Sequence, residues 1–277
     1  MSRNTLNAKL TSRLGVFAYG AVCYGLFLAT FLYAVGFVEG LTPTSLTVGL
    51  FDSPLAEAVA INVGLLGLFA VQHLIMARRW FKRIWTRIIP PAAERSTFVL
   101  ATCLVFLALF TLWRPIPVVV WEIESMAGKM TLWTLSALGY LVVLLATYMI
   151  DHFDLFGLRQ VTLYLRNKPY TKPRFKEWVF YKHVRHPLML GFLGAFWSTP
   201  VMTVGQLLFA GGVTGFVLIA LQFEERDLVT EHGEEYRKYQ QRVPMLVPFL
   251  RLGTNAVAET DTRPVSYTHL RAHETDS

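Results

Sequence analysis

Five long apolar runs constrain this chain more than any other feature of its sequence. Each has enough apolar residues to cross the hydrocarbon core of a bilayer as a helix, and they cover residues 14–38, 58–77, 97–113, 131–150 and 204–222. A sixth run, 188–200, is shorter, so we expect it to form a helical hairpin with the run after it. The sequence therefore predicts an all-α membrane protein with about six transmembrane helices and a hairpin near its C-terminus.

The composition supports this fold class. Hydrophobic residues make up 53% of the chain and charged residues only 16%, and the mean hydropathy is +0.41. A soluble globular domain has more charge and less apolar surface. Residues 1–250 are expected to form one integral-membrane domain, and the first run is expected to remain as a helix because it is long and lacks a small-residue cleavage site.

The net charge of +7 is distributed in a way that predicts topology. The chain has 26 lysines and arginines, and with the N-terminus inside, all of them except Arg114 and Lys129 fall in inner segments. The positive-inside rule then places both termini in the cytosol, as in a multi-pass protein of a bacterial inner membrane. Membrane lipids are expected partners of the basic segments, no nucleic acid is expected, and the oligomeric state does not follow from the sequence.

Cysteine and histidine positions predict no metal site. Cys23 and Cys103 both fall inside predicted spans, which leaves no disulfide framework and no spacing typical of metal ligands. His269 and His273 have a ligand-like spacing, but residues 265–277 resemble the read-through of a sequencing-library adapter. We therefore exclude that segment from functional arguments and treat residues 251–264 as a tail.

Two inner segments are polar enough to contribute to a site. Residues 78–95 are basic and aromatic and contain two adjacent prolines, which predicts an amphipathic helix on the inner headgroup layer followed by a helix stop. This segment is either a topology anchor or a gate for substrate. Residues 151–185 are interrupted by proline and glycine, so we expect short helices and turns that form a cytosolic cap.

The strongest local pattern is Arg185-His186-Pro187 at the start of the shorter run. Pro187 suits the first turn of a helix, because its missing backbone donor has no partner there. Arg185 and His186 would then stand beside a helix N-terminus, where an anion binds well. Glu224 and Glu225, at the inner end of the returning helix, would face the same side of the membrane. The structural alternative is a topology signal with a helix start, and a solvated glutamate pair.

The motifs after the hairpin extend this pattern. A short helix is expected at residues 234–241, with Tyr236 and Tyr239 on one face, and Pro244 follows it. In this order the motifs resemble the isoprenylcysteine carboxyl methyltransferase superfamily, which includes phospholipid methyltransferases. The resemblance implies that S-adenosylmethionine is the methyl donor and that residues 151–248 hold it. The residues implied to bind this cofactor are His183, Arg185, His186, Pro187, Leu188, Gly191, Glu224, Glu225, Tyr236, Tyr239 and Pro244.

Four further stretches are similar to the membrane-bound methanethiol S-methyltransferases, namely residues 72–78, 90–97, 151–160 and 196–203. They are less closely similar to membrane proteins encoded beside denitrification genes. The resemblance implies transfer of a methyl group to methanethiol, which gives dimethyl sulfide. Met189 and Met245 depart from the broader superfamily, and the lack of an arginine at position 245 argues against a prenylcysteine carboxylate as the acceptor.

Three functions stay open on the sequence. The first is methylation of a small thiol. The second keeps the reaction class and changes the acceptor to another thiol or a lipid, of prenylcysteine or phospholipid type. The third is a non-catalytic membrane protein of nitrogen-oxide metabolism.

A thiol methyltransferase needs groups that favour the thiolate form of its substrate. We expect His152 and Asp154, two residues apart at the end of the fourth run, to remove the thiol proton or to orient the group that does. Arg185 completes the set of expected catalytic residues. The alternative for His152 and Asp154 is a polar helix end at the headgroups.

His73 is an ionisable residue inside the second run, where such a group requires a partner or a polar surrounding. We expect it to line the substrate path together with Phe153 and Trp197. Packing against a neighbouring helix is the alternative for His73.

Overall fold

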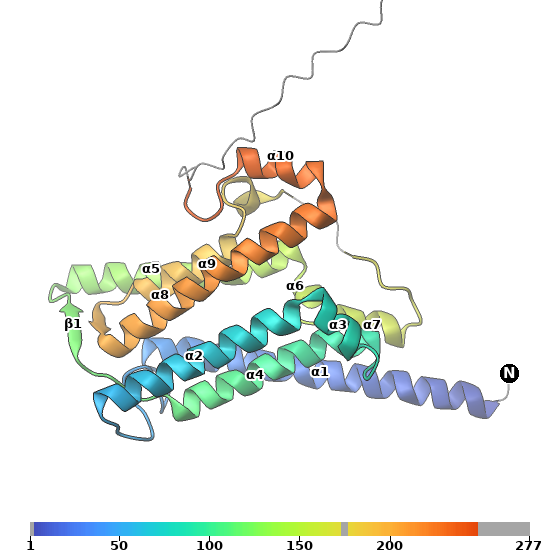
Figure 1. The fold of residues 1–277 in the computed structure, drawn as a ribbon, viewed down its shortest axis with the longest axis horizontal. Helices are drawn as coiled ribbons and strands as arrows, with labels where there is room; N and C mark the ends of the chain where they lie inside the picture. The colour runs from blue at the N-terminus through green and yellow to red at the C-terminus, as the bar shows by residue number, and fades with distance from the viewer. Residues whose placement is uncertain (1–2, 173–176, 249–277) are drawn as a thin grey trace, which may run out of the picture.

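The computed structural model describes residues 3–172 and 177–248, and these residues form mainly long helices that run side by side (Figure 1). The expectations for residues 251–264 and 265–277 lie outside the described residues. Five helices within the described part are long and apolar enough to cross a membrane. Four of the helices that carry these spans are α1 (Arg3–Glu39), α2 (Leu55–Ala77), α5 (Met126–Ile150) and α9 (Val204–His232), and the fifth is α4 (Glu94–Leu112) with the short turn before it.

These helices confirm the five long apolar runs as candidate spans, but the sixth run differs. It forms α8 (Pro187–Trp197), a helix of 11 residues. At the rise of an α-helix this is roughly 16 Å, about half the thickness of the hydrocarbon core. The expectation of a sixth span is therefore not confirmed, because α8 is too short to cross a bilayer by itself.

The helices form two groups that meet along α2 and α9. In Figure 1, α1, α2 and α4 lie together, and α5, α8 and α9 form the other group. A shared apolar core joins the groups, and its buried rings include Phe37 of α1, Phe110 of α4 and Phe209 of α9. The van der Waals packing of these rings helps to hold the two groups together within a membrane.

Helices α5 and α8 approach each other more closely than side chains normally permit. A Cβ atom added at Gly139 would lie 2.7 Å from the carbonyl oxygen of Gly191 and from the amide nitrogen of Ala195. A Cβ atom at Gly191 would lie 2.7 Å from the carbonyl oxygen of Gly139. Small residues at such a crossing let two backbones pack directly in a membrane. Gly191, expected to bind the cofactor, is therefore a packing residue in the structure.

One end of the helices carries two short strands that the apolar pattern did not predict. Strand β1 (Val119–Glu122) pairs in antiparallel fashion with β2 (Val201–Thr203). Thr203 also caps α9, because its hydroxyl accepts from the amide of Gln206 while the Gln206 side chain accepts from the amide of Thr203. We call this the strand end of the molecule.

The opposite end carries short helices, and we call it the basic end. It contains α3 (Arg79–Trp85), α6 (His152–Leu155) and α7 (Leu158–Leu165), and Figure 1 shows them together beside α1, whose first residues extend past them. The amphipathic helix expected in residues 78–95 is only the seven residues of α3, since turns and the 3₁₀ helix η1 (Pro91–Ala93) follow it. A second 3₁₀ helix, η2 (Val179–Lys182), precedes α8, and α10 (Glu234–Arg242) follows the break at Gly233.

Candidate active site at the basic end

Glu225 is the shared acceptor of the residues that flank α8 and α9. Its Oε1 atom lies 2.9 Å from Nε of Arg185, 2.6 Å from Nε2 of His186 and 2.9 Å from the hydroxyl of Tyr236. Its Oε2 atom accepts from the side-chain amide of Gln240. Only 7% of Glu225 is exposed, so these donors replace the water that a carboxylate needs. The structure thus brings Arg185 and His186 to Glu225, which follows them in the sequence by 40 and 39 residues, respectively.

The segment after α10 closes this cluster through its backbone. The amide of Arg185 donates to the carbonyl of Pro244 at 2.9 Å, and the amide of His186 donates to the carbonyl of Met245 at 3.2 Å. Nη1 of Arg185 donates to the carbonyls of Gln240 and Val243, each at 2.9 Å. Arg185, just before α8, therefore bonds both to α9 and to the C-terminal segment.

Tyr236 and Tyr239 lie inside the cluster and not on an open face. Each is only 1% exposed, and the hydroxyl of Tyr239 donates to the carbonyl of Tyr181 at 2.6 Å. Burial raises the pKa of both phenols far above their usual value, and for Tyr236 the nearby Glu225 adds to this effect. Both hydroxyls therefore remain protonated donors. Cofactor binding by Tyr236 and Tyr239 stays a prediction, and their buried rings leave no open face for it.

Glu224 has different surroundings from its neighbour. Its side chain is 48% exposed, and Oε2 lies 3.9 Å from Nδ1 of His186. It forms no hydrogen bond with the part of the chain that the structure describes. Glu225 is thus saturated by protein donors, whereas the carboxylate of Glu224 is available to a ligand beside His186.

Arg95 is a residue of this region to which the sequence analysis gave no role. It lies in the first turn of α4, where Nε donates to the carbonyl of Leu155 at 2.6 Å and the guanidinium lies 4.9 Å from the ring centre of Phe98. It also interacts electrostatically with Asp154 and Glu224, which come from α6 and α9. The signal that points to it is a charge at the edge of an apolar run, since ionisable residues at membrane level are commonly functional.

His152 and Asp154 do not form a pair in the structure. Nδ1 of His152 lies 2.8 Å from the hydroxyl of Thr147, and Nε2 lies 2.8 Å from the hydroxyl of Tyr24. Because the Thr147 hydroxyl already donates to the carbonyl of Leu144, it accepts from Nδ1, and Tyr24 donates to Nε2. Burial lowers the pKa of His152, so the ring is neutral with both nitrogens engaged. This arrangement does not favour His152 as a proton acceptor.

Asp154 belongs to a separate set of contacts. Its Oδ1 atom accepts from Nη1 of Arg159 at 2.8 Å, and its Oδ2 atom accepts from the hydroxyl of Tyr170 at 3.1 Å. Burial and the neighbouring Asp154 raise the pKa of Tyr170 to about 12. Asp154 therefore orders the segment after α7, and its electrostatic link to Arg95 places it near the cluster.

The three residues expected along a substrate path lie at different levels. His73 lies in the last third of α2 near the basic end, and Phe153 is 46% exposed beside His152. Trp197 is the last residue of α8, at the strand end, where its indole donates to Thr214 at 3.0 Å. Trp197 thus lies at the opposite end of α8 from His186. That His73, Phe153 and Trp197 line one substrate path stays a prediction.

The remaining expected cofactor residues frame the start of α8. His183 is exposed directly after η2, while Pro187 is buried as the first residue of α8, as the sequence predicted. Leu188 follows it within the first turn and is half-buried. Their contact with a cofactor stays a prediction.

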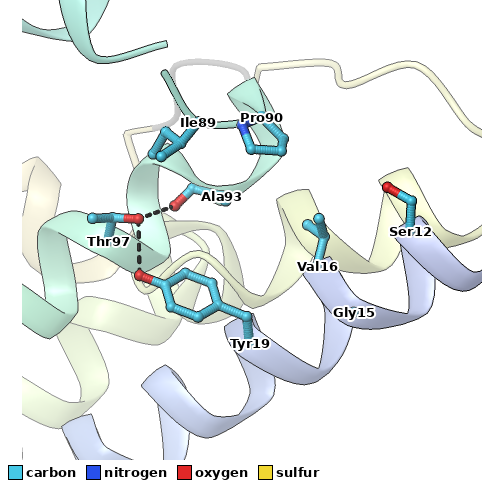
Figure 2. A pocket seen from close by; sticks show the side chains of 8 residues that line it. All are labelled: Ser12, Gly15, Val16, Tyr19, Ile89, Pro90, Ala93 and Thr97. Carbon is cyan, nitrogen blue, oxygen red and sulfur yellow. Dashed lines mark hydrogen bonds between the residues drawn. The ribbon is translucent and has the colours of Figure 1, made fainter. Parts of the chain in front are cut away.

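A separate hollow of about 430 Å³ lies between the start of α4 and the first half of α1 (Figure 2). Its wall includes Gly15, Tyr19, Pro90 and Thr97, and a hydrogen bond of 2.9 Å joins the hydroxyls of Tyr19 and Thr97. None of the expected site residues lines it. Within the described residues, no group of three histidine, cysteine or acidic side chains is placed to hold a metal ion.

These features define a class: a multi-pass helical membrane protein whose basic end carries a buried Arg-His-Glu cluster beside an accessible carboxylate. The chain is 51% identical over 231 residues to the methanethiol S-methyltransferase of Mycobacterium tuberculosis, which covers 83% of this chain and 95% of the relative. It is 48% identical to the enzyme of that name from Crocosphaera subtropica, over 90% of this chain and 97% of the relative. The chain therefore belongs to the methanethiol S-methyltransferase family.

A more distant similarity links the chain to a eukaryotic protein. Human Nurim is 28% identical over 197 residues, which cover 68% of this chain and 74% of Nurim. This similarity supports membership of the isoprenylcysteine carboxyl methyltransferase-like superfamily. No family model and no solved structure matches the chain.

Proposed function

We propose that this protein transfers a methyl group from S-adenosylmethionine to methanethiol, giving dimethyl sulfide and S-adenosylhomocysteine. The observation that carries the proposal is the family, since several relatives at 48–51% identity over most of the chain are methanethiol S-methyltransferases. The site supports it independently, because a buried ionic cluster of this kind is typical of functional sites in membrane proteins.

The residues available at the basic end fit the chemistry of the methyl donor. The donor has a carboxylate, a ribose diol and a positively charged sulfur that carries an electrophilic methyl group. Arg95 has guanidinium nitrogens that form no hydrogen bond with described residues, and it suits the carboxylate. Glu224, without a hydrogen-bond partner among the described residues, suits the ribose hydroxyls or the sulfonium charge.

The cluster around Glu225 has a positioning role in this proposal. Glu225 and the carbonyl of Met245 fix the ring and backbone of His186, so Nδ1 faces the side on which Glu224 lies. Methyl transfer between two sulfur atoms needs alignment more than proton shuttling at the donor, so a rigid binding surface supplies much of the acceleration. In this proposal the bound donor and the apolar helices beside it keep water from the reacting atoms.

The membrane arrangement is part of the same proposal. We assign the protein to a bacterial inner membrane with both termini in the cytosol, where the methyl donor is available. Lys129 and Arg114 are the two basic residues expected on the outer side, and both lie toward the strand end, opposite the basic end. Lys129 pairs there with Glu122 of β1, and Arg114 bonds to Asn62. An excess of lysine and arginine marks the cytosolic side of membrane proteins.

The test is an assay on membranes from a host that lacks the gene, with labelled S-adenosylmethionine and either methanethiol, hydrogen sulfide or a prenylcysteine analogue. We expect labelled dimethyl sulfide in the headspace from methanethiol. Methylation of only the prenylcysteine analogue, or of no thiol, contradicts the proposed substrate.

The donor site is tested by calorimetric titration of the purified protein with S-adenosylhomocysteine. Glu224→Gln is expected to weaken binding by about tenfold or more, because a hydrogen bond to a charged group contributes about 1.5–3 kcal/mol. Glu234→Gln is the matched control, since that glutamate is exposed on α10 and, among the described residues, pairs with Arg237 alone. Equal affinity of the two variants removes Glu224 from the donor site.

A further inference from the structure

His73 has a buried nitrogen that the fold leaves unpaired. Its Nδ1 atom is buried and forms no hydrogen bond within the described residues. A buried polar atom without a partner is costly, so such an atom in a folded protein calls for a functional explanation. It lies four residues before the end of α2, close to the basic end.

Three phenylalanine rings from three helices surround this imidazole. The ring centres of Phe69, Phe98 and Phe216 lie 5.3, 4.9 and 5.6 Å from the ring centre of His73. They belong to α2, α4 and α9. Arg95, on α4, is the charged group that interacts electrostatically with His73 in the described part of the chain. An apolar surrounding with an unpaired, buried imidazole nitrogen suits a small, weakly acidic and apolar molecule such as an alkanethiol.

The position of His73 along the bundle relates it to Glu224. Helices α2 and α9 run side by side: His73 lies against Phe216, and beyond them Arg78 pairs with Asp227 at 3.2 Å. Phe216 precedes Glu224 by eight residues, which is roughly 12 Å along a helix. This separation has the scale of one nucleoside-sized molecule. A ligand of that size, held by Glu224 and extending along α9 toward Phe216, would reach the level of His73.

We propose that Nδ1 of His73 is the proton acceptor for the thiol substrate, and that Phe69, Phe98 and Phe216 contact its alkyl group. This inference rests on the proposed function. The S–H bond breaks and an N–H bond forms at Nδ1, while the electron pair stays on the thiol sulfur. That sulfur forms the new C–S bond with the donor's methyl group, the old C–S bond breaks with its electron pair on the leaving thioether, and the imidazolium then releases its proton to water. Net, the cationic donor and the thiol give two neutral thioethers and one proton.

His152 offers no such nitrogen, because Thr147 and Tyr24 occupy both sides of its ring. His186 differs from His73 in its surroundings, because its Nε2 atom contacts Glu225 and its Nδ1 atom lies 3.9 Å from Oε2 of Glu224, in a polar cluster. Among these three histidines, only His73 combines a buried, unpaired nitrogen with an apolar surrounding.

The test compares His73→Gln and His73→Leu with the wild-type protein and with His232→Gln, a matched control at the last residue of α9. We expect the His73 variants to bind S-adenosylhomocysteine within about threefold of the wild type by calorimetry. Their kcat/KM for methanethiol is expected to fall by about 10²–10⁴-fold, the usual contribution of a general base. His232→Gln is expected to keep both values.

The thiol's own acidity separates a proton acceptor from a packing residue. With 2,2,2-trifluoroethanethiol, which ionises far more readily than methanethiol, the loss in the His73 variants is expected to shrink below about tenfold. With methanethiol, variant activity is expected to rise about tenfold for each pH unit, because the fraction of thiolate does. If the fluorinated thiol is not a wild-type substrate, this pH profile makes the distinction.

Three outcomes overturn the inference. One is wild-type kcat/KM in both His73 variants, and another is an equal loss with both thiols and at every pH. The third is loss of S-adenosylhomocysteine binding in both variants, which assigns His73 a structural role. Failure of the proposed function is distinct from all three, since the wild-type protein would then form no dimethyl sulfide.

Discussion

Glu224 and Glu225 are neighbours in the sequence, yet they differ in what surrounds them. Glu225 accepts from four side chains and is nearly closed to solvent, whereas Glu224 is half-exposed beside His186. Along a helix, adjacent residues point about 100° apart, so one turns into the cluster and the other away from it. Glu225 therefore serves the stability of the fold, and its neighbour Glu224 is left for ligand binding.

We predict that Glu225→Gln lowers the free energy of unfolding by about 3–5 kcal/mol, because it leaves the buried guanidinium of Arg185 without its counter-charge. Equilibrium unfolding in mixed micelles measures this change. Glu224→Gln is the control and is expected to stay within about 0.5 kcal/mol of the wild type. Similar stability of the two variants would contradict the assignment of Glu225 as the structural acceptor.

His152 gives a second prediction at the residue scale, on pH. Burial lowers its pKa in the folded state, against a smaller opposite effect of Asp151, whereas the unfolded chain has the ordinary value near 6.5. Between these two values the unfolded state binds the proton and the folded state does not, so stability rises with pH and falls on acidification. The melting temperature is expected to drop as pH falls below about 6.5.

The control for this pH effect is His152→Gln. That variant loses hydrogen bonds with Tyr24 and Thr147 and is less stable at neutral pH. Its melting temperature is expected to depend less steeply on pH between 5 and 7 than that of the wild type. An identical slope in the two proteins assigns the acid sensitivity to other groups.

At the scale of elements, the crossing of α5 and α8 brings two helix backbones into direct contact. We predict that Gly139→Ala costs about 1–3 kcal/mol of stability, because its new methyl group meets backbone atoms of α8 at 2.7 Å that cannot move independently. Gly194→Ala, on the open side of α8, has nothing within 4 Å and is expected to be neutral or slightly stabilising. Unfolding of both variants under the same conditions checks the difference.

The sequence predicted the elements that have a pattern of their own. Apolar length predicted the five candidate spans, and Pro187 and Gly233 predicted where α8 begins and where α9 gives way to α10. The strands were not predicted. With four and three residues, β1 and β2 are too short to show a periodic pattern, and each forms only by pairing with the other. The length of α8 was not predicted, because an apolar run does not show where its helix ends.

At the scale of the whole molecule, the sequence predicted which site residues meet, and only part of how. Motif order placed Arg185, His186 and Glu225 on one side of the membrane, and the structure joins them. It did not predict the burial of Tyr236, because helical spacing shows which residues share a face and not what covers that face. Arg95 was missed because its neighbours come from α6 and α9, far away in the chain.

Topology also belongs to this scale and has a direct test. We predict that a cysteine at Leu50, exposed in the loop before α2, reacts with a membrane-impermeant maleimide in intact cells. A cysteine at Lys168, exposed after α7, is expected to react only after the cells are permeabilised. The native Cys23 and Cys103 are buried and give little background. The reverse labelling pattern would contradict the cytosolic assignment of the basic end.

The shared carboxylate of Glu225 constrains the order in which contacts form during synthesis. Arg185 leaves the ribosome 40 residues before Glu225 and 55 before Gln240, which at ordinary synthesis rates is a wait of roughly 2 to 10 seconds. During that wait the guanidinium of Arg185 depends on water for its hydrogen bonds. The contacts that fix the start of α8 can therefore form only after α9 and the C-terminal segment have been made.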